Sequence, residues 1–238
     1  MNEIYKRTEM LIGKASGDVL KKSHIMIFGI GGVGSYAAEA IARAGVGEIT
    51  LVDKDKVSVS NINRQLIALN STVGKSKVEV MKSRIEDINP GIKVNAVEKF
   101  CLPENIDEFF DRKIDYVIDA VDTVSAKIAI VEKCKKVGIE IISAMGAGNK
   151  LNPEDFQIED IYKTEECPLC RVMRRELKKR GIADLKVVYS KEKSKSLQNE
   201  VDGESGKVIP GSISFVPSVM GLILAGEAIK DLILDNKI

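Results

Sequence analysis

Residues that could handle a nucleotide and its phosphates follow one another in the first third of this 238-residue chain. They form a glycine motif (Gly29–Gly34), two acids (Asp53 and Asp55), a polar run (Ser60–Gln65) and a lysine-rich turn (Gly74–Lys77). A dinucleotide enzyme needs the glycines and one ribose-binding acid, but not an added arginine and lysine aimed at phosphates. An enzyme that cleaves ATP between its α- and β-phosphates needs both cations, because negative charge spreads over the phosphate oxygens as pyrophosphate leaves. The order of the motifs therefore predicts an adenylating enzyme.

The glycine motif is expected to hold phosphates at the start of a helix. Glycines let the backbone turn tightly and approach an anion, and a helix N-terminus favours negative charge. Asp53 lies 24 residues after Gly29, which suits an acid that binds the ribose hydroxyls. The alternatives are a tight turn without ligand for the glycines and a helix or turn cap for Asp53. The nucleotide-binding residues expected from this part of the chain are Gly29, Gly31, Gly32, Gly34, Asp53 and Asp55.

The polar run and the lysine behind it are expected to bind phosphate. Asn61, Arg64 and Gln65 lie on a loop that leads into a short helix, and they follow the ribose-type acid. Lys77 begins an amphipathic helix, which is a poor place for a cation unless it neutralises an anion there. A solvated surface is the alternative for these polar residues.

An acid further along the chain is a candidate metal ligand. Asp122 follows an apolar run that ends at Asp119, and a carboxylate at that position could hold Mg²⁺ near the phosphates. The alternative is that Asp122 caps the helix expected from Ser125.

Alternating strand and helix patterns position these residues. Short apolar runs predict buried strands, and apolar residues spaced by three or four predict helices. The alternation up to residue 143 predicts an α/β protein with a doubly wound, mostly parallel, Rossmann-like sheet. The expected strands are 24–28, 49–52, 92–97, 116–119, 139–142 and 156–161, and the expected helices are 32–44, 75–88, 125–136, 168–180 and 216–234.

The length of the chain fits a single domain, 1–238, with a buried core. Residues 1–22 are expected to form N-terminal helices, and residues 23–150 the nucleotide-binding core. Residues 151–238 are expected to form a mixed part that serves substrate binding or dimer contacts. Within it, residues at about 190–208 include only three large apolar side chains and are expected to form a mobile loop.

Charge and composition indicate the cellular compartment of the protein but do not identify a binding partner. The net charge of +1 gives no global argument for nucleic acid or membrane. The charged first residues lack the apolar run of a signal peptide, and four cysteines without such a signal imply a reducing, cytoplasmic location. Residues 208–226 carry no charge over membrane-span length, but prolines, glycines and serines interrupt them. We expect a buried or interface helix at 216–234 and no stable membrane insertion. Insertion of this helix into a membrane is the alternative.

Taken together, the motifs resemble the E1-like adenylation superfamily, which includes ubiquitin-activating enzymes and bacterial activators of sulfur-carrier proteins. The resemblance rests on the four motifs above and on Asp119-Ala-Val-Asp-Thr123. It implies ATP and Mg²⁺ as cofactors. The roles that it implies are ribose binding by Asp53, phosphate binding by Arg64 and Lys77, metal binding by Asp122, and a nearby polar contact by Asn61.

The same resemblance implies a catalytic residue near the N-terminus. Arg7, in the segment Tyr5–Gly13, is similar to an arginine that reaches into the ATP site of a partner subunit. This role implies a homodimer, and a plain surface arginine is the alternative. The catalytic set implied by the resemblance is Arg7, Arg64, Lys77 and Asp122.

The second half of the chain resembles one branch of the superfamily, the tRNA threonylcarbamoyladenosine dehydratases. These enzymes use ATP to activate the carboxylate of the threonylcarbamoyl side chain on adenosine 37 as an acyl-adenylate. The ureido group of the same side chain then closes a ring and expels AMP. The resemblance implies a tRNA substrate that carries this side chain, and it rests on Ser143–Pro153, Asp160–Thr164, Cys167–Leu169, Arg171–Gly181 and Gly211–Pro217.

Two other functions stay open at this point. An activator of a ubiquitin-like sulfur carrier would bring a C-terminal glycine to the same ATP site. Such activators usually hold zinc with two Cys-x-x-Cys pairs, and this chain has one, Cys167 and Cys170, whose metal binding and sulfur or redox partners stay open. The other open function is that of a Rossmann-type binding protein without catalytic activity. Arg64, Lys77 and Asp122 argue against it.

Positive charge is concentrated around this cysteine pair. From Lys163 to Lys195 the chain has eleven Lys or Arg against five Asp or Glu, in a protein whose net charge is +1. Such clustering favours contact with a tRNA backbone, and a solvated basic helix is the alternative. Residues at i, i+3, i+4 and i+7 share one helix face. The expected tRNA-binding residues on this face are Arg171, Arg174, Arg175 and Lys178.

Overall fold

The strands and helices of the protein are known from a computed structural model, which describes residues 3–193, 200–201 and 208–234. The strands are β1 (His24–Phe28), β2 (Glu48–Val52), β3 (Lys93–Val97), β4 (Tyr116–Asp119), β5 (Glu140–Ala144), β6 (Phe156–Asp160), β7 (Lys186–Ser190), β8 (Glu200–Val201) and β9 (Val208–Ile209). The helices are α1 (Lys6–Ile12), α2 (Lys14–Lys22), α3 (Gly34–Ala44), α4 (Lys77–Ile88), α5 (Val124–Val137), α6 (Pro168–Lys179) and α7 (Phe215–Leu234).

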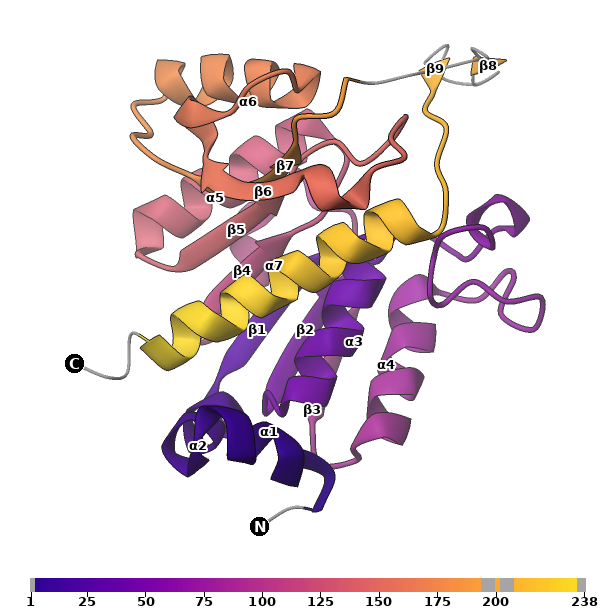
Figure 1. The fold of residues 1–238 in the computed structure, drawn as a ribbon, viewed down its shortest axis with the longest axis vertical. Coiled ribbons are helices and arrows are strands. Elements are labelled where there is room, and N and C mark those ends of the chain that lie inside the picture. The colour runs from indigo at the N-terminus through magenta and orange to yellow at the C-terminus, as the bar shows by residue number, and fades with distance from the viewer. Residues whose placement is uncertain (1–2, 194–199, 202–207, 235–238) are drawn as a thin grey trace.

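Seven strands form one twisted sheet in the order β3-β2-β1-β4-β5-β7-β6 (Figure 1). All neighbouring strands in it run parallel except β6 and β7, which pair antiparallel. Strand order reverses beside β1, because β2 and β3 lie on one side of it and β4 and β5 on the other. In such sheets, ligands bind at the carboxyl ends of the strands at this switch point. The predicted doubly wound α/β fold is confirmed.

Helices cover both faces of the sheet, and each face has its own apolar core (Figure 1). One core packs the sheet against α3, α4 and α7 through residues such as Ile41, Met81 and Leu224. The other packs it against α5 and α6 through residues such as Ile130 and Met173. Strands buried on both faces read as continuous apolar runs, which explains why 24–28 and 116–119 could be predicted without alternation.

The helix α7 lies directly against the start of α3. A Cβ atom on Gly221 would lie 2.2 Å from the carbonyl oxygen of Val33, so only glycine permits this approach. One turn earlier, the ring of Pro217 packs on Gly32, where a Cβ would lie 3.3 Å from Pro217 Cγ. The helix predicted at 216–234 is therefore confirmed, and it contacts the glycine motif. None of the helices in the described residues is long and apolar enough to cross a membrane.

The C-terminal part contains the main difference from the sequence-based expectation. Strand β7 was not predicted, although it pairs parallel with β5 and antiparallel with β6 inside the sheet. Ser190, where the mobile loop was expected to begin, is the last residue of this strand. Most of that expected loop (194–199 and 202–207) lies outside the described residues.

Candidate nucleotide-binding site

The glycine motif forms a tight loop between β1 and α3, which we call the glycine loop (Gly29–Gly34). Gly29 has φ +86°, and a Cβ on it would lie 2.6 Å from the carbonyl oxygen of Ala120 after β4. A Cβ on Gly34 would lie 1.8 Å from the carbonyl oxygen of Gly29, so the loop closes on itself. The N-terminus of α3 has no side-chain cap. The Ser35 N–H already donates to the Gly31 carbonyl at 3.1 Å, so the N–H groups just before it are the ones suited to bind an anion.

Asp53, at the carboxyl end of β2, ties this loop to the next one. Its Oδ2 accepts a hydrogen bond from the Ile30 N–H at 2.7 Å, and its Oδ1 accepts one from the Asp55 N–H at 2.8 Å. These bonds match the turn-cap alternative. An ionised carboxylate has about four acceptor sites, so the two remaining ones leave room for ribose hydroxyls.

Asn61 has a local structural contact. It ends a short 3-10 helix (Val59–Asn61), and its Oδ1 accepts a hydrogen bond from the Ser58 N–H at 3.1 Å. The short helix therefore contains Asn61 and comes before Arg64 and Gln65, whereas the sequence predicted a short helix after these polar residues. Between Ile62 and Ser76 the chain forms turns and bends without a helix.

Arg64 and Gln65 lie over the glycine loop. The stem of Arg64 packs on Gly32, where a Cβ would be 3.3 Å from Arg64 Cγ. Its Nη1 donates to Ser60 O and to Asn63 Oδ1, both at 2.9 Å, which fixes the guanidinium while leaving other N–H donors available. Gln65 is buried and approaches Gly31, and its Oε1 has no hydrogen-bond partner among the described residues. A buried, unsatisfied amide beside a glycine cradle fits a site for a polar ligand such as ATP.

Lys77 approaches the same edge of the sheet from the first turn of α4. Its Nζ lies 2.9 Å from Asp55 Oδ2, and its backbone N–H donates to the Asp55 carbonyl at 3.0 Å. The side chain of Lys77 is only 7% exposed, whereas that of Asp55 is 52% exposed. A buried cation is thus held at a helix N-terminus by a carboxylate that is open to solvent on one side.

Asp122 is exposed in the turn between β4 and α5. Its Oδ1 accepts a hydrogen bond from Thr123 Oγ1 at 3.3 Å. The N-cap of α5 is Thr123, and no side chain caps the helix. Asp122 is therefore not the cap that the sequence allowed as an alternative. One exposed carboxylate beside phosphates is the kind of protein ligand that Mg²⁺ uses.

A buried network beneath this turn was missed by sequence reasoning. Lys127 Nζ lies 2.9 Å from Asp119 Oδ2 and 3.3 Å from Ser143 Oγ, and Ser143 also donates to Asp119. The N–H of Val121 donates to Asp119 Oδ1 at 3.2 Å, so the network holds the turn that carries Asp122. A lysine within the apolar pattern of a predicted helix, eight residues after a strand-end acid, is the signal that could have revealed it.

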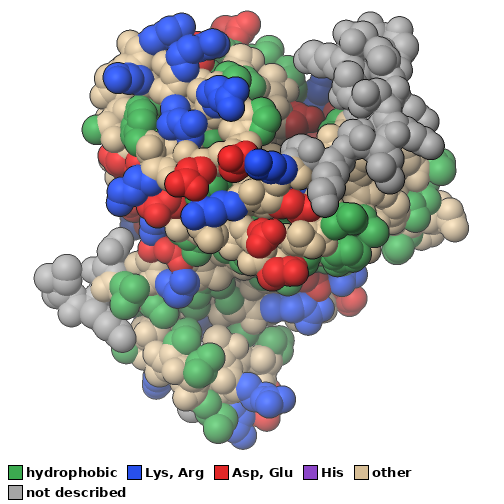
Figure 2. All heavy atoms as spheres, turned by 45° about the horizontal axis from the view of Figure 1, so that its top comes forward, with side chains coloured by type: hydrophobic (Ala, Val, Ile, Leu, Met, Phe, Trp, Pro, Cys, Tyr) green, Lys and Arg blue, Asp and Glu red, His purple; other side chains and the backbone are tan. Residues whose placement is uncertain are grey.

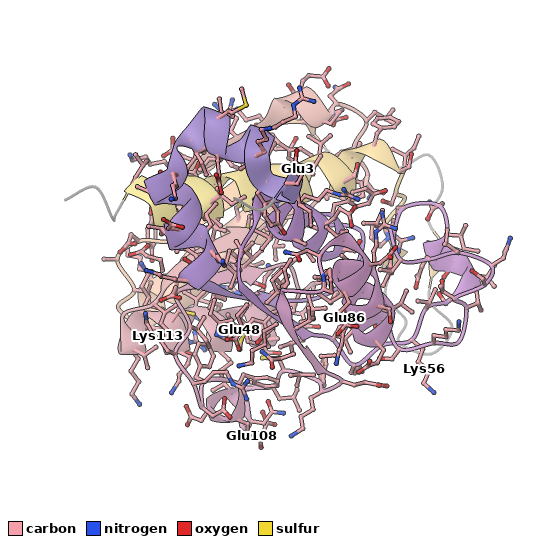
Figure 3. All side chains as sticks on the ribbon, turned by 90° about the horizontal axis from the view of Figure 1, so that it is seen from below. Glu3, Glu48, Lys56, Glu86, Glu108 and Lys113 are labelled. Atoms are coloured by element: carbon pink, nitrogen blue, oxygen red, sulfur yellow. The ribbon has the colours of Figure 1, made fainter. Side chains whose placement is uncertain are left out.

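Arg7 lies far from the glycine loop of its own chain. It is exposed on α1, and α1 and α2 precede β1, so they lie at the amino ends of the parallel strands (Figure 1). Figure 3 views the molecule from this end, with Glu3 just before α1 and Glu48 at the start of β2. The glycine loop, Arg64 and Lys77 are brought together at the carboxyl edge, and Arg7 is not among them.

The sequence matches the ThiF family over residues 5–237, almost its whole length. The chain belongs to the ThiF family. The tRNA threonylcarbamoyladenosine dehydratase of Bacillus subtilis is 47% identical over 98% of this chain and 96% of that relative.

Solved structures agree with this assignment. The crystal structure of the E. coli tRNA N6-threonylcarbamoyladenosine dehydratase TcdA in complex with ATP has a TM-score of 0.89 and 34% identity. The match covers 98% of this chain and 95% of TcdA. The complex of TcdA with AMP has a TM-score of 0.88 and 35% identity, over 97% of this chain and 94% of TcdA. The E1-like resemblance of the motifs, including the dehydratase branch, is confirmed.

In this ThiF-family chain, the four expected tRNA-binding residues on α6 differ in their contacts. Arg171, Arg175 and Lys178 are exposed, and Figure 2 shows basic side chains gathered over this end of the molecule. Arg174 is half-buried, because its Nη1 donates to the carbonyl of Thr164 at 2.8 Å and to the Thr164 hydroxyl. The buried stripe of α6 (Cys170, Met173, Leu177) explains the difference, since Arg174 lies one turn from Cys170 at the edge of that stripe.

The cysteine pair lies at the N-terminus of the same helix. Cys167 and Cys170 are buried free thiols, as are Cys101 and Cys134. Among the residues that the structure describes, no third His, Cys, Asp or Glu joins the pair to form a metal site. The donor set therefore does not fit a closed zinc site, which takes four ligands.

Proposed function

We propose that the protein is an ATP-dependent tRNA threonylcarbamoyladenosine dehydratase, an enzyme of tRNA modification. The observation that carries the proposal is the identity of 47% to a dehydratase over nearly the full length of both chains. The site supports it independently, because the glycine loop, Arg64 and Lys77 offer anion-binding groups along one edge of the sheet, and Gln65 Oε1 offers a buried hydrogen-bond acceptor beside them.

In the proposed reaction, the carboxylate on the tRNA side chain attacks the α-phosphorus of ATP, and the bond to the β-phosphate oxygen breaks. Pyrophosphate leaves, and a mixed anhydride with AMP remains. The ureido nitrogen then attacks the activated carbonyl, loses its proton and displaces AMP, so the side chain loses one water overall. The fixed guanidinium of Arg64 and the ammonium of Lys77 stabilise the charge that develops on the phosphates. Asp53 binds the ribose, with Asp55 and Asn61 close to the nucleotide.

Asp122 is proposed as the protein ligand of Mg²⁺. Its neighbour Asp119 is not available for a metal, because Lys127 and Ser143 occupy the Asp119 carboxylate in a fully buried network. The exposed carboxylate of Asp122 would share the ion with phosphate oxygens, a typical arrangement for Mg²⁺.

The protein is further proposed to act as a cytoplasmic homodimer in which Arg7 completes the ATP site of the partner subunit. Arg7 lies at the opposite end of the strands from the glycine loop of its own chain, so it can reach such a site only in another copy. Met10 and Leu11 on the same helix are 80% and 87% exposed, which supports a contact there.

The C-terminal part, residues 151–238, is proposed to receive the tRNA. Arg171, Arg175 and Lys178 would contact the phosphate backbone, whereas Arg174 would serve the fold through Thr164. A sulfur-carrier activator is the alternative, and it would need the C-terminal tail of a carrier protein rather than tRNA as the substrate.

The deciding experiment compares two tRNA preparations with the purified protein and ATP. tRNA that carries the threonylcarbamoyl side chain should release AMP and pyrophosphate, and nucleoside mass spectrometry should find a product lighter by one water. tRNA from cells that lack the modification is the control and should give neither product. Release of ADP, or AMP release only when a sulfur carrier is added, would overturn the proposal.

A further inference from the structure

The cysteine pair occupies a position that the proposed reaction does not use. Cys167 is the N-cap of α6 and Pro168 is its first residue, so the pair has the Cys-x-x-Cys spacing at a helix N-terminus. Cys167 Sγ accepts a hydrogen bond from the Cys170 N–H at 3.5 Å. The spacing brings both sulfurs to the same end of one helix, and both are free thiols.

The surroundings of the two sulfurs differ. The Cys170 thiol and the backbone N–H groups of Cys170, Gly146 and Leu169 donate to Cys167, and these hydrogen bonds lower the pKa of Cys167. The same thiol contact, together with burial, raises the pKa of Cys170. The directions of these two pKa shifts favour Cys167 as the attacking sulfur and Cys170 as the thiol that resolves the mixed disulfide.

The other two cysteines provide an internal contrast. Burial raises the pKa of Cys101 to about 12 and also raises the pKa of Cys134. Both belong to the same apolar cluster as Cys167 and Cys170, but neither lies at a helix N-terminus that would stabilise a thiolate. They are expected to stay inert as buried structural thiols.

We propose that Cys167 and Cys170 form a redox-active dithiol that reacts with a low-molecular-weight disulfide. The Cys167 thiolate attacks one sulfur of that disulfide, forms a mixed disulfide and releases one thiolate. Cys170 then gives its proton to the released thiolate and attacks Cys167 Sγ, which expels the second small thiolate. The protein gains one disulfide bond, and the small disulfide is reduced to one thiol and one thiolate, because Cys170 supplies the single proton.

The pair is linked to the loop that follows β5. The backbone N–H of Gly146 contributes to the lowered pKa of Cys167, and Gly146 begins the run that continues through Asn149 to Lys150. The non-glycine residues with positive φ among those described are Asn149 (φ +58°) and Glu166 (φ +54°), one in this loop and one directly before Cys167. Because a disulfide sulfur is a much weaker acceptor than a thiolate, oxidation weakens the bond that holds Gly146.

The test is equilibration of the full-length protein in glutathione buffers, from fully reduced to fully oxidised. Acid quenching, alkylation of free thiols and peptide mapping then count the thiols and locate the bond. The wild type should lose two of its four alkylatable thiols and give a 167–170 disulfide. Exchange of the Gly146 amide with deuterated water should become faster in the oxidised protein.

Single substitutions separate the two roles. C170S should stop at a mixed disulfide between glutathione and Cys167, whereas C167S should stay unmodified. A C101A/C134A double variant is the matched control and should oxidise like the wild type. The proposal is overturned if the native wild type keeps four free thiols in oxidised glutathione while urea-unfolded protein oxidises, or if the bond involves Cys101 or Cys134. None of these readouts uses ATP or tRNA, so they do not depend on the proposed function.

Discussion

Two lysine–aspartate pairs near the carboxyl edge of the sheet have the same length and different surroundings. In both, Nζ lies 2.9 Å from a carboxylate oxygen. The Lys127–Asp119 pair is sealed, with side chains 1% and 0% exposed. The Lys77–Asp55 pair is open on one side, because Asp55 is 52% exposed.

The comparison teaches that the surroundings of an ion pair, rather than its length, separate a structural lysine from a reactive one. Among the residues that the structure describes, the sealed pair has only Ser143 and the Val121 N–H as further partners, so its role is to hold the β4–α5 turn. In the open pair, Asp55 can be hydrated while Lys77 turns to an incoming phosphate. Breaking the first pair should damage the fold, and breaking the second should damage catalysis.

The largest effect is expected from Asp119→Ala. This change leaves the charge of Lys127 buried without its carboxylate, and loss of one partner of a buried pair costs about 3–5 kcal/mol. Urea unfolding followed by circular dichroism measures the loss. Asp55→Ala is the matched control and should cost less than about 1 kcal/mol, as expected for a partly exposed pair. Equal losses for both variants would remove the distinction.

Lys77→Met should affect the reaction more than the fold. Removal of one preorganised group that stabilises transition-state charge costs on the order of 10²–10³ in kcat. AMP release in single-turnover assays measures this loss, and urea unfolding checks the stability. A Lys77→Met protein that unfolds as easily as Asp119→Ala and retains normal turnover would contradict this distinction between a structural and a reactive lysine.

Asp122→Asn tests the proposed Mg²⁺ ligand on the turn that the sealed pair holds in place. If Asp122 holds Mg²⁺, kcat should fall by roughly 10²-fold with little change in ATP affinity, because the ion acts mainly on the developing charge. Titration of activity with Mg²⁺ should then require more metal than the wild type does. Unchanged turnover and unchanged metal dependence would reduce Asp122 to a surface residue.

Asp55→Asn should have a smaller effect. The change removes a negative charge that competes with phosphate for Lys77, and an exposed pair is worth about 0.2–1 kcal/mol. ATP binding, measured by calorimetry, should therefore tighten by at most about fivefold. Weaker binding would instead mean that Asp55 contacts the nucleotide directly.

The smallest effect is expected on α6, where the half-buried Arg174 lies beside the exposed Arg171 and Arg175, of which Arg175 also pairs with Glu176 at 3.0 Å. Arg171→Ala with Arg175→Ala should lower the dependence of tRNA affinity on salt by roughly one unit of logarithmic slope for each lost phosphate contact. Arg174→Ala should leave this slope unchanged, because its guanidinium is bound to Thr164. Filter binding at several salt concentrations measures the slope. The reverse pattern would assign tRNA contact to Arg174.

The sequence predicted local features well and missed those made by distant residues. Strands 24–28 and 116–119 and the position of the glycine loop could be predicted, because the motif and its strand are contiguous. Strand β7 could not, since its five residues join the sheet only through partners in β5 and β6. The Lys127–Asp119–Ser143 network was missed for the same reason, because its members come from a helix and two strands. The hydrogen bond from Arg174 to Thr164 could not be predicted from helix periodicity alone.

The packing of Pro217 and Gly221 on the start of α3 affects the order in which a newly synthesised chain matures. The ribosome makes the glycine loop early and α7 late, so a growing chain has the loop before it has the helix that steadies it. The growing chain should then be unable to bind ATP until α7 has left the ribosome exit tunnel. Stalled nascent chains that end before residue 215 should fail to retain ATP, whereas chains extended well beyond residue 234 should bind it.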